Sequence, residues 1–487
     1  MKVHGQSKFS LSANPVVSED GNAVLYEVFA SFTEGTTVTN YTLLNSVAYM
    51  SIGSTVESST PPSVECLGAG ASEILPINDI VKAIGGATAM SSSSGSGYSA
   101  DECSKGLFKV SMNGITFVLC VSGSTGFKLL GSDMDITVEY LKTDVTVAPP
   151  IVYTDSSDDD DCETVVAASP VTPIGKSLLT GNLDSTHVER NLEPEFFWNH
   201  EDENSCSCKS TKRPCLFIHG MGVDEEEPGV IDSFSNYWGN LTDHAPCCSS
   251  FKYTKLNTVD NAWTNSTLQQ KVCDRAVSVS QRSSKTVIAD TIIITHSMGN
   301  LMVAGAIATG KCSLDSSSTW VGLAGPMKGS MASDFVQDTC AGETNEVLEK
   351  VANITGRCPA NVALQGLPSQ GGNHSSAELN AAYTAAQEAY TKNVSALMCS
   401  DGFSGLPSKY QAQFWVLGNL VPYKSDKNDG MVEFDSCAAG IPEEKFGDTW
   451  NSTFYKTKLN HYDSEFLYGD ALLDKKKMPI KWFECLL

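Results

Sequence analysis

The chain has 487 residues, with 57 acidic and 33 basic side chains and a formal net charge of -24. This excess of negative charge repels phosphate backbones and anionic membrane surfaces, so the composition argues against a nucleic-acid-binding protein. Hydrophobic residues make up 41% of the chain, which is ordinary for a globular protein and excludes general disorder. Because one hydrophobic core rarely serves more than about 300 residues, we expect two domains.

Cysteines and glycosylation signals indicate an exported protein. The 16 cysteines are even in number and show no zinc-site spacing, which favours a disulfide framework formed in an oxidising compartment. Asn-x-Ser/Thr acceptors for N-glycosylation point the same way. The acceptors are Asn40, Asn240, Asn265, Asn353, Asn373, Asn393 and Asn451.

The N-terminus and the hydropathy pattern complete the prediction of localisation. The opening residues MKVHGQSKFS contain no apolar run, so no signal peptide is present in this numbering. We expect the numbering to begin at or near a mature N-terminus. No stretch of about 20 apolar residues occurs, and no transmembrane segment is predicted.

Residues 1–147 are predicted to form a β-rich domain, because they contain several β-branched and aromatic runs. Asn113-Gly114 separates two such runs and is typical of a tight hairpin turn. A short helix over 77–84 and a flexible Ser/Gly-rich loop over 91–99 are also expected. The predicted strands cover 24–32, 39–52, 106–121 and 135–141. No known family matches this region, and an extracellular or cell-wall ligand would be its expected partner.

Residues 148–175 are predicted to be a linker, because prolines and the acidic run 158–161 leave little to bury. Four cysteines lie before or within this linker and twelve lie after it, so each part can close its own disulfides. A calcium site in the acidic run is the less favoured interpretation, since spaced ligands and a turn glycine are missing.

Residues 176–487 alternate short apolar runs with helical patterns, which predicts a mainly parallel sheet covered by helices. The run Ile-Ile-Ile at 292–294 has the continuous hydrophobicity of a strand that is buried on both faces. Helices are expected over 267–279, 300–309 and 375–397, the last with a capping box from Ser375 to Glu378. The predicted strands cover 215–218, 251–257, 291–295, 320–324, 414–417 and 454–459.

The run 295–299, Thr-His-Ser-Met-Gly, follows a predicted strand and precedes a predicted helix. A serine on such a sharp strand-to-helix turn is held in a strained conformation above the sheet edge, ready for nucleophilic attack. Ser297 is therefore the candidate nucleophile. Threonine at position 295, where glycine is usual, departs from the common pattern.

The remaining candidate residues also follow predicted strands. The backbone amides of Met221, after the His219-Gly220 turn, and Met298 are expected to form an oxyanion hole. His461 is the candidate base, and Asp429 is the candidate acid that holds its tautomer, with Asp426 as the alternative. The chain order of serine, acid and histidine is the order that α/β-hydrolases use. His219 is expected to be structural.

The stretch from position 215 to the C-terminus resembles the secreted lipase branch of the α/β-hydrolases. The resemblance rests on His-Gly-Met-Gly at 219–222, His-Ser-Met-Gly-Asn at 296–300, Gly-Pro-Met-Lys-Gly-Ser at 325–330, Asn-Asp-Gly-Met-Val at 428–432 and Asn-His at 460–461. Met327 stands where the family commonly has histidine, so any role of that histidine is lost here.

The resemblance implies an α/β-hydrolase fold, a lid insertion over about 331–413 and cleavage of acyl esters or lipids through an acyl-serine intermediate. It implies no metal and no organic cofactor. Two other classes of function stay open. One is an acyltransferase or amidase that uses the same triad, and the other is a catalytically silent extracellular binding protein. The acidic run 224–227, after the oxyanion turn, is interpreted as a solvated loop in preference to a cation site.

Overall fold

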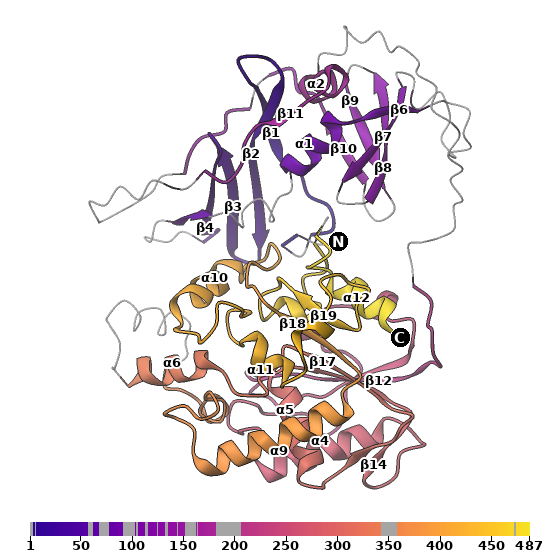
Figure 1. The fold of residues 1–487 in the computed structure, drawn as a ribbon, viewed down its shortest axis with the longest axis vertical. Helices are drawn as coiled ribbons and strands as arrows, with labels where there is room; N and C mark the ends of the chain where they lie inside the picture. Colours follow the sequence, from indigo (N-terminus) through magenta and orange to yellow (C-terminus); the bar gives the residue numbers. More distant parts are fainter. Residues whose placement is uncertain are drawn as a thin grey trace. The chain divides into compact units, whose positions relative to one another are not determined.

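The computed structural model describes residues 3–4, 6–56, 62–67, 77–90, 103, 106–112, 115–123, 125–131, 135–143, 145–150, 162, 164–181, 206–341, 358–471 and 474–487. The chain divides into two compact units, drawn as ribbons in Figure 1. The first comprises Met1–Asn204 with Ala471–Asp474, and the second comprises Ser205–Asp470 with Lys475–Leu487. None of the helices in the described ranges is long and apolar enough to cross a membrane.

The first unit contains two antiparallel sheets, which confirms the β-rich prediction. One has the order β1-β2-β3-β4-β5, with β11 added beside β2, and the other has the order β10-β9-β8-β7-β6. The strands are β1 (Ser12–Val17), β2 (Ala23–Glu34), β3 (Thr37–Leu44), β4 (Val47–Ser54), β5 (Ser63–Leu67), β6 (Thr88–Met90), β7 (Gly106–Met112), β8 (Ile115–Gly123), β9 (Gly126–Leu130), β10 (Asp135–Glu139) and β11 (Ser169–Pro170). The expected helix is α1 (Ile77–Gly85).

One predicted strand of this unit is wrong in its extent. The run 39–52 forms two strands, because Asn45 and Ser46 adopt φ values of 52° and 69° and reverse the chain. Such left-handed values suit a tight hairpin turn. The predicted hairpin at 106–121 is present as β7 and β8. Its Asn113-Gly114 turn, the tract 91–99 and the acidic run 158–161 lie outside the described residues.

The boundary between the units falls after position 204, later than the predicted linker end at 175. Residues at the end of that linker belong to the first unit. Strand β11 pairs with β2, and helix α2 (Pro173–Thr180) buries Leu178 and Leu179 in the core that α1, β7, β8 and β9 share. Thr172 caps this helix by accepting a hydrogen bond from the Gly175 amide at 3.0 Å. Thr172 and Pro173 therefore begin a helix and are not part of an extended linker.

The second unit is built on a parallel sheet with the order β13-β12-β15-β17-β18-β19. The predicted mainly parallel sheet is therefore confirmed. Its strands are β12 (Arg213–Ile218), β13 (Cys248–Tyr253), β15 (Ile292–His296), β17 (Thr319–Leu323), β18 (Ala396–Ser400) and β19 (Phe454–Thr457), and a separate pair is formed by β14 (Val287–Ile288) and β16 (Ser313–Leu314).

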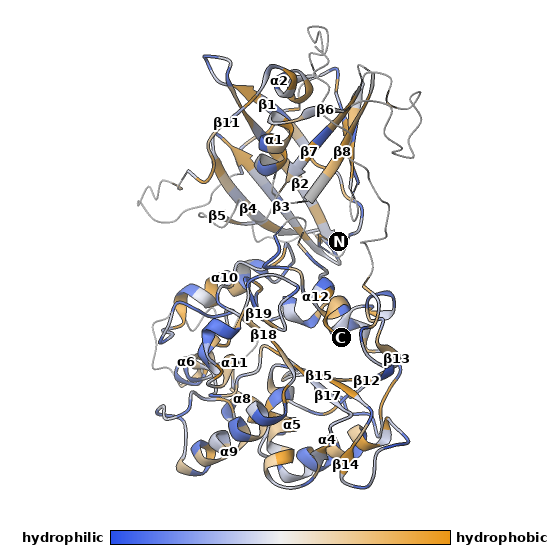
Figure 2. Ribbon diagram, turned by 45° about the vertical axis from the view of Figure 1, so that its right-hand side comes forward, coloured by the Kyte–Doolittle hydropathy of each residue, from blue (hydrophilic) through white to orange (hydrophobic). Residues whose placement is uncertain are grey.

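Helices cover both faces of this sheet, because neighbouring strand residues point to opposite sides. Leu216 of β12 packs in one hydrophobic cluster with side chains of α4 (Ser266–Ser278), α5 (Met298–Ala308) and α9 (Ala377–Asn393). On the other face, the Phe217 ring lies 5.2 Å from Trp238 in α3 (Ser235–Trp238) and 6.1 Å from Phe483 in α12 (Pro479–Leu486). Figure 2 shows the hydrophobic strands β12 and β15 between these layers.

One predicted element of the second unit is wrong, and another is too long. The run 414–417 is not a strand but part of helix α10 (Gln411–Leu420), in which Phe414 and Leu417 face the same apolar cluster one turn apart. The helix predicted over 375–397 ends earlier and is followed by strand β18. Its N-cap is Ser376, whose hydroxyl accepts from the Leu379 amide at 3.2 Å, rather than Ser375.

The predicted lid insertion over 331–413 is also too long. Helix α9 packs in the core beside α5, and β18 pairs with β17 and β19 inside the sheet. These elements belong to the body of the domain. The described part of the segment between β17 and α9 contains α6 (Met331–Cys340) and α8 (Val362–Gln365).

All 16 cysteines form disulfides within their own unit. The pairing agrees with the even counts expected on either side of the linker. The first unit holds Cys66–Cys162 and Cys103–Cys120, and the second holds Cys206–Cys485, Cys208–Cys247, Cys215–Cys248, Cys273–Cys312, Cys340–Cys358 and Cys399–Cys437.

Candidate active site

Ser297 is the single residue between the end of the buried strand β15 and the start of helix α5. Its backbone has φ 52° and ψ -128°, a conformation that non-glycine residues rarely adopt. Such strain persists only where the surrounding structure enforces it, and it is concentrated at functional sites. The turn places Ser297 at the N-terminus of α5, whose free amides and dipole favour negative charge.

Two glycines allow the chain to pass close to this serine. A Cβ atom on Gly299 would lie 2.6 Å from the Ile218 carbonyl oxygen and 2.7 Å from the His219 carbonyl oxygen. Helix α5 can therefore approach the end of β12 only with glycine at this position. A Cβ atom on Gly220 would lie 2.6 Å from the Ser297 Cβ atom, so the turn after β12 runs directly against the serine.

A hydrogen-bond network accounts for threonine at position 295. The buried Thr295 hydroxyl donates to Asn300 Oδ1 at 2.5 Å and accepts from Trp320 Nε1 at 2.8 Å. The Asn300 amide nitrogen in turn donates to the carbonyls of Ser297 at 3.1 Å and Leu323 at 3.0 Å. This network joins the strained turn to β17, so the threonine stabilises the turn in place of the usual glycine.

The structure brings together the predicted nucleophile, base and acid. His461 Nε2 lies 2.8 Å from Ser297 Oγ, and His461 Nδ1 lies 2.8 Å from Asp429 Oδ2. The other carboxylate oxygen of Asp429 accepts from the amides of Met431 at 2.8 Å and Val432 at 2.7 Å. Three hydrogen bonds thus hold the carboxylate in place, and with Nδ1 donating to it, Nε2 can accept the serine proton.

Asp426, the alternative acid, differs from Asp429 in its exposure to solvent. It is exposed, whereas Asp429 and His461 are each only 2% exposed. The backbone also joins the chosen pair, because the His461 amide donates to the Asp429 carbonyl at 2.9 Å. The geometry therefore favours Asp429 as the partner of His461.

Neither of the two amides predicted for the oxyanion hole donates to an acceptor in the described part of the chain. The Gly220 amide donates to the Tyr237 hydroxyl at 2.8 Å, the Gly222 amide to the Thr258 carbonyl at 3.3 Å and the Val223 amide to the Thr258 hydroxyl at 3.2 Å. Within the described residues, the amide of Met221 between them has no acceptor, and neither has the amide of Met298. Two free donors beside a nucleophile can hold a developing oxyanion.

His219 is structural, as expected. It is fully buried, its Nδ1 donates to the Gly220 carbonyl at 2.8 Å, and its Nε2 accepts from the Leu256 amide at 3.0 Å. Burial lowers the pKa of this imidazole to about 4, so it stays neutral. Its two hydrogen bonds fix the turn that carries Met221.

The order of strands explains how the acid and the base meet the serine. Parallel strands β15, β18 and β19 end at the same sheet edge, and the segments after them carry Ser297, Asp429 and His461. The predicted strand before the acid was wrong, because β18 rather than 414–417 precedes it. Asp429 nevertheless lies at the predicted edge, since α10 between β18 and the acid leads the chain back to it.

The acidic run 224–227 is partly paired, in agreement with a solvated loop. Glu225 contacts Lys255, and Glu226 lies 2.6 Å from Lys271. No group of three or more His, Cys, Asp or Glu side chains suited to a metal ion occurs among the residues that the structure describes.

The glycosylation acceptors differ in exposure. Asn240, Asn373 and Asn451 are exposed. The half-buried acceptors Asn40, Asn265 and Asn393 use their side-chain amides in hydrogen bonds, respectively to Ser51, Asn261 and the Ala389 carbonyl. Asn353 lies outside the described residues.

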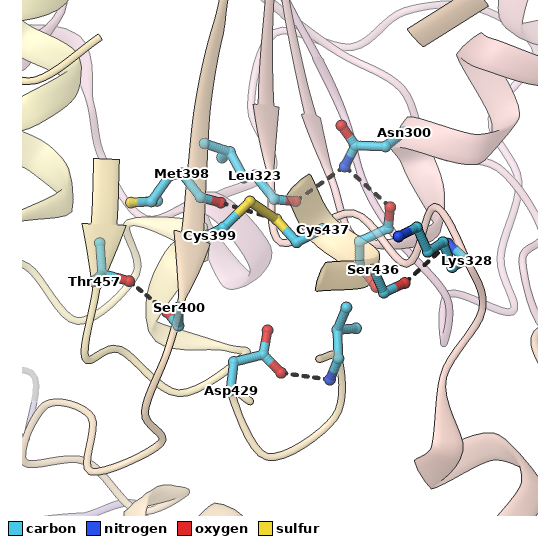
Figure 3. Close-up of a disulfide and its surroundings, with 12 residues drawn as sticks. Asn300, Leu323, Lys328, Met398, Cys399, Ser400, Asp429, Ser436, Cys437 and Thr457 are labelled. Carbon is cyan, nitrogen blue, oxygen red and sulfur yellow. Dashed lines mark hydrogen bonds between the residues drawn. A yellow bond between two sulfur atoms is a disulfide. The ribbon is translucent and has the colours of Figure 1, made fainter. Parts of the chain in front are cut away.

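The Cys399–Cys437 disulfide joins β18 to α11 (Phe434–Ala438), directly after the Asp429 turn (Figure 3). It closes a loop of 38 residues, so we expect the double variant Cys399→Ala/Cys437→Ala to lose about 3 to 4 kcal/mol of unfolding free energy in urea titrations. Cys273–Cys312 spans 39 residues and provides a matched control. Both double variants are expected to lose similar stability, but only the first should lower kcat under folding conditions. Equal kcat values in the two double variants would show that the Cys399–Cys437 disulfide does not hold Asp429 in position.

The buried carboxyl of Glu433, four positions after Asp429, should make the unfolding free energy of the protein depend on pH. Burial raises the pKa of this carboxyl from its ordinary 4.5 to about 7. Between these values the folded protein binds more protons than the unfolded chain, so unfolding free energy falls as pH rises, by at most about 1.4 kcal/mol per pH unit. Glu433→Gln has no such proton to lose. Its stability relative to wild type should therefore increase from pH 4.5 to 7 in urea titrations, and a constant difference would contradict this.

Comparisons with known proteins give little guidance. No protein-family model matches the chain, and no curated protein sequence matches it either. Among solved structures, a lipase from Staphylococcus hyicus aligns with a TM-score of 0.30 and 16% identity, over 57% of this chain and 94% of the lipase. A prolyl oligopeptidase B from Galerina marginata aligns with a TM-score of 0.19 and 10% identity, over 84% of this chain and 59% of its own. TM-scores this low do not establish a shared fold.

Proposed function

We propose that the second unit is an α/β-hydrolase that cleaves carboxylic esters through an acyl-serine intermediate. The observation that carries this proposal is the relay from Asp429 through His461 to Ser297, with 2.8 Å at each of its two contacts. Parallel strands, a strained serine turn and two free amides beside the serine support it.

Each group has a defined part in the proposed reaction. His461 takes the Ser297 proton as the hydroxyl attacks the ester carbonyl, and Asp429 stabilises the imidazolium that forms. The Met221 and Met298 amides hold the negative oxygen of the tetrahedral intermediate. His461 then returns the proton to the leaving alcohol, and a water molecule repeats the sequence to release the acid.

Substrate preference is a separate proposal. The motif resemblance to secreted lipases supports an acyl ester or lipid as substrate. A series of p-nitrophenyl esters from short to long acyl chains, together with matched anilides and an alcohol acceptor, tests it. Turnover of esters alone supports the esterase or lipase assignment. Cleavage of anilides would favour an amidase, acyl transfer to the alcohol at the expense of hydrolysis would favour an acyltransferase, and no turnover would favour a binding protein.

We propose that the protein is exported and glycosylated. The disulfides support an oxidising compartment, and the exposed Asn240, Asn373 and Asn451 are the acceptors with free access. A loss of mass at these asparagines after glycosidase treatment is expected. The first unit is proposed to bind an extracellular or cell-wall ligand, and such binding would persist in Ser297→Ala.

A further inference from the structure

A polar cluster beside the triad, in which two members are buried and one is half-buried, takes no direct part in the proposed reaction. It consists of Tyr237 on α3, His296 at the end of β15 and Glu465 in a 3-10 turn (Asp463–Glu465). The Tyr237 hydroxyl lies 2.6 Å from His296 Nδ1, and Glu465 Oε1 lies 3.4 Å from the same nitrogen. His296 is 1% exposed and Glu465 6%. Burying polar side chains is costly unless they are well paired, so the contacts of His296 and Glu465 call for an explanation.

The direction of each hydrogen bond follows from the chemistry of the atoms. His296 Nε2 lies 3.1 Å from the His461 carbonyl, which can only accept, so Nε2 carries a proton. Burial and then the neighbouring His461 hold the pKa of His296 well below its usual range, so the ring is neutral and Nδ1 accepts. The Tyr237 hydroxyl therefore donates to Nδ1.

The Tyr237 hydroxyl also accepts a hydrogen bond from the turn that precedes the Met221 amide. The Gly220 amide donates to the Tyr237 oxygen at 2.8 Å. One continuous chain of hydrogen bonds thus runs from Gly220 through Tyr237 and His296 to the carbonyl of His461. Burial followed by Asp463 raises the pKa of Glu465 well above its usual range, which favours the neutral form of the carboxyl beside this chain.

This chain connects three parts of the site that are far apart in sequence. Gly220 precedes the Met221 amide, His296 precedes Ser297, and His461 is the base. Loops held only by their own backbones shift easily, whereas a shared set of hydrogen bonds fixes their separation. We propose that Tyr237 and His296 are positioning residues, which set the distance between the oxyanion amides, the nucleophile and the base. This inference rests on the proposed hydrolase function.

Tyr237→Phe removes the hydroxyl and with it the hydrogen bonds to Gly220 and His296 and the contact with Glu465. We expect kcat to fall about 10- to 100-fold with KM nearly unchanged, because misplacing a catalytic group by a fraction of an ångström affects the transition state more than substrate binding. Tyr253→Phe is the matched control. Tyr253 is buried and stacks on Phe217, but it lies outside the chain of hydrogen bonds. The kcat of this variant should therefore stay at the wild-type value.

Substitutions of His296 separate positioning from packing. His296→Gln keeps a side-chain N–H that can reach the His461 carbonyl, whereas His296→Leu fills similar space without any donor. We expect kcat to decrease from wild type to glutamine to leucine. Thermal unfolding is measured for the two tyrosine variants and the two His296 variants. It identifies those that lose activity simply because they are less folded at the assay temperature.

The decisive comparison is kcat and KM of wild type, Tyr237→Phe, Tyr253→Phe and Ser297→Ala on one activated ester. A loss of kcat in Tyr237→Phe but not in Tyr253→Phe, at equal thermal midpoints, supports the positioning role. Equal kcat in the two tyrosine variants overturns it while the hydrolase proposal stands. Equal rates in wild type and Ser297→Ala would overturn the hydrolase proposal and the positioning role together.

Discussion

Ser297→Ala is expected to reduce turnover of an activated ester by at least about 10⁴-fold, with the fold and the melting temperature retained. The reason is that no other group takes over the bond to the acyl carbon when Oγ is absent, and only the oxyanion amides remain to assist water. Initial rates on a p-nitrophenyl ester measure the effect.

Ser278→Ala serves as the matched control for this variant. Ser278 lies at the end of α4, where its hydroxyl donates to the Arg275 carbonyl at 2.7 Å. Its replacement also removes one serine hydroxyl but should leave the rate unchanged. Residual activity of Ser297→Ala within tenfold of wild type would mean that another residue is the nucleophile.

Asp429→Asn is expected to lower kcat by about 10⁴-fold. The asparagine oxygen can still accept from the Met431 and Val432 amides, so the turn keeps its shape. Its amide nitrogen then faces His461 Nδ1 and donates to it. This forces the imidazole proton onto Nε2, where the ring can no longer accept the serine proton.

Asp426→Asn provides the comparison, because it makes the same chemical change three positions earlier on an exposed side chain. Its rate should stay within about twofold of wild type, as expected for a surface substitution away from the site. A large loss in Asp426→Asn together with a small loss in Asp429→Asn would reverse the assignment of the acid.

The sequence was sufficient to predict the parts of the site that depend on local pattern. The strand before Ser297 is a run of isoleucines that only a strand buried on both faces requires, and the glycines at 220 and 299 mark close backbone approaches. The order of serine, acid and histidine along the chain then placed Asp429 and His461 at the same edge. The structure brings these three residues into hydrogen-bonding contact.

Other elements could not be predicted because their local patterns are ambiguous. The run 414–417, Phe-Trp-Val-Leu, has the aromatic and β-branched composition of a strand, yet it lies in α10, where tertiary packing of Phe414 decides. Strand β18 has the sequence Ala-Leu-Met-Cys-Ser, whose residues suit a helix equally well, so the sequence pattern predicts a continuation of the preceding helix.

The positioning cluster had no sequence signal at all. Tyr237, His296 and Glu465 come from three separate segments, and the packing of α3 and of the 463–465 turn against the end of β15 brings them together. Likewise, Thr172 and Pro173 were interpreted as part of a linker, although threonine before proline is also a helix start. The composition of the surrounding segment outweighed that local signal.

We propose that Ser297 is an activated nucleophile at an α/β-hydrolase site. Treatment of the purified protein with a fluorophosphonate, followed by peptide mapping by mass spectrometry, tests it most directly. We expect a single covalent adduct on the peptide that contains Ser297, and no adduct in Ser297→Ala. An adduct on another serine, or none on the correctly folded wild-type protein, would contradict it.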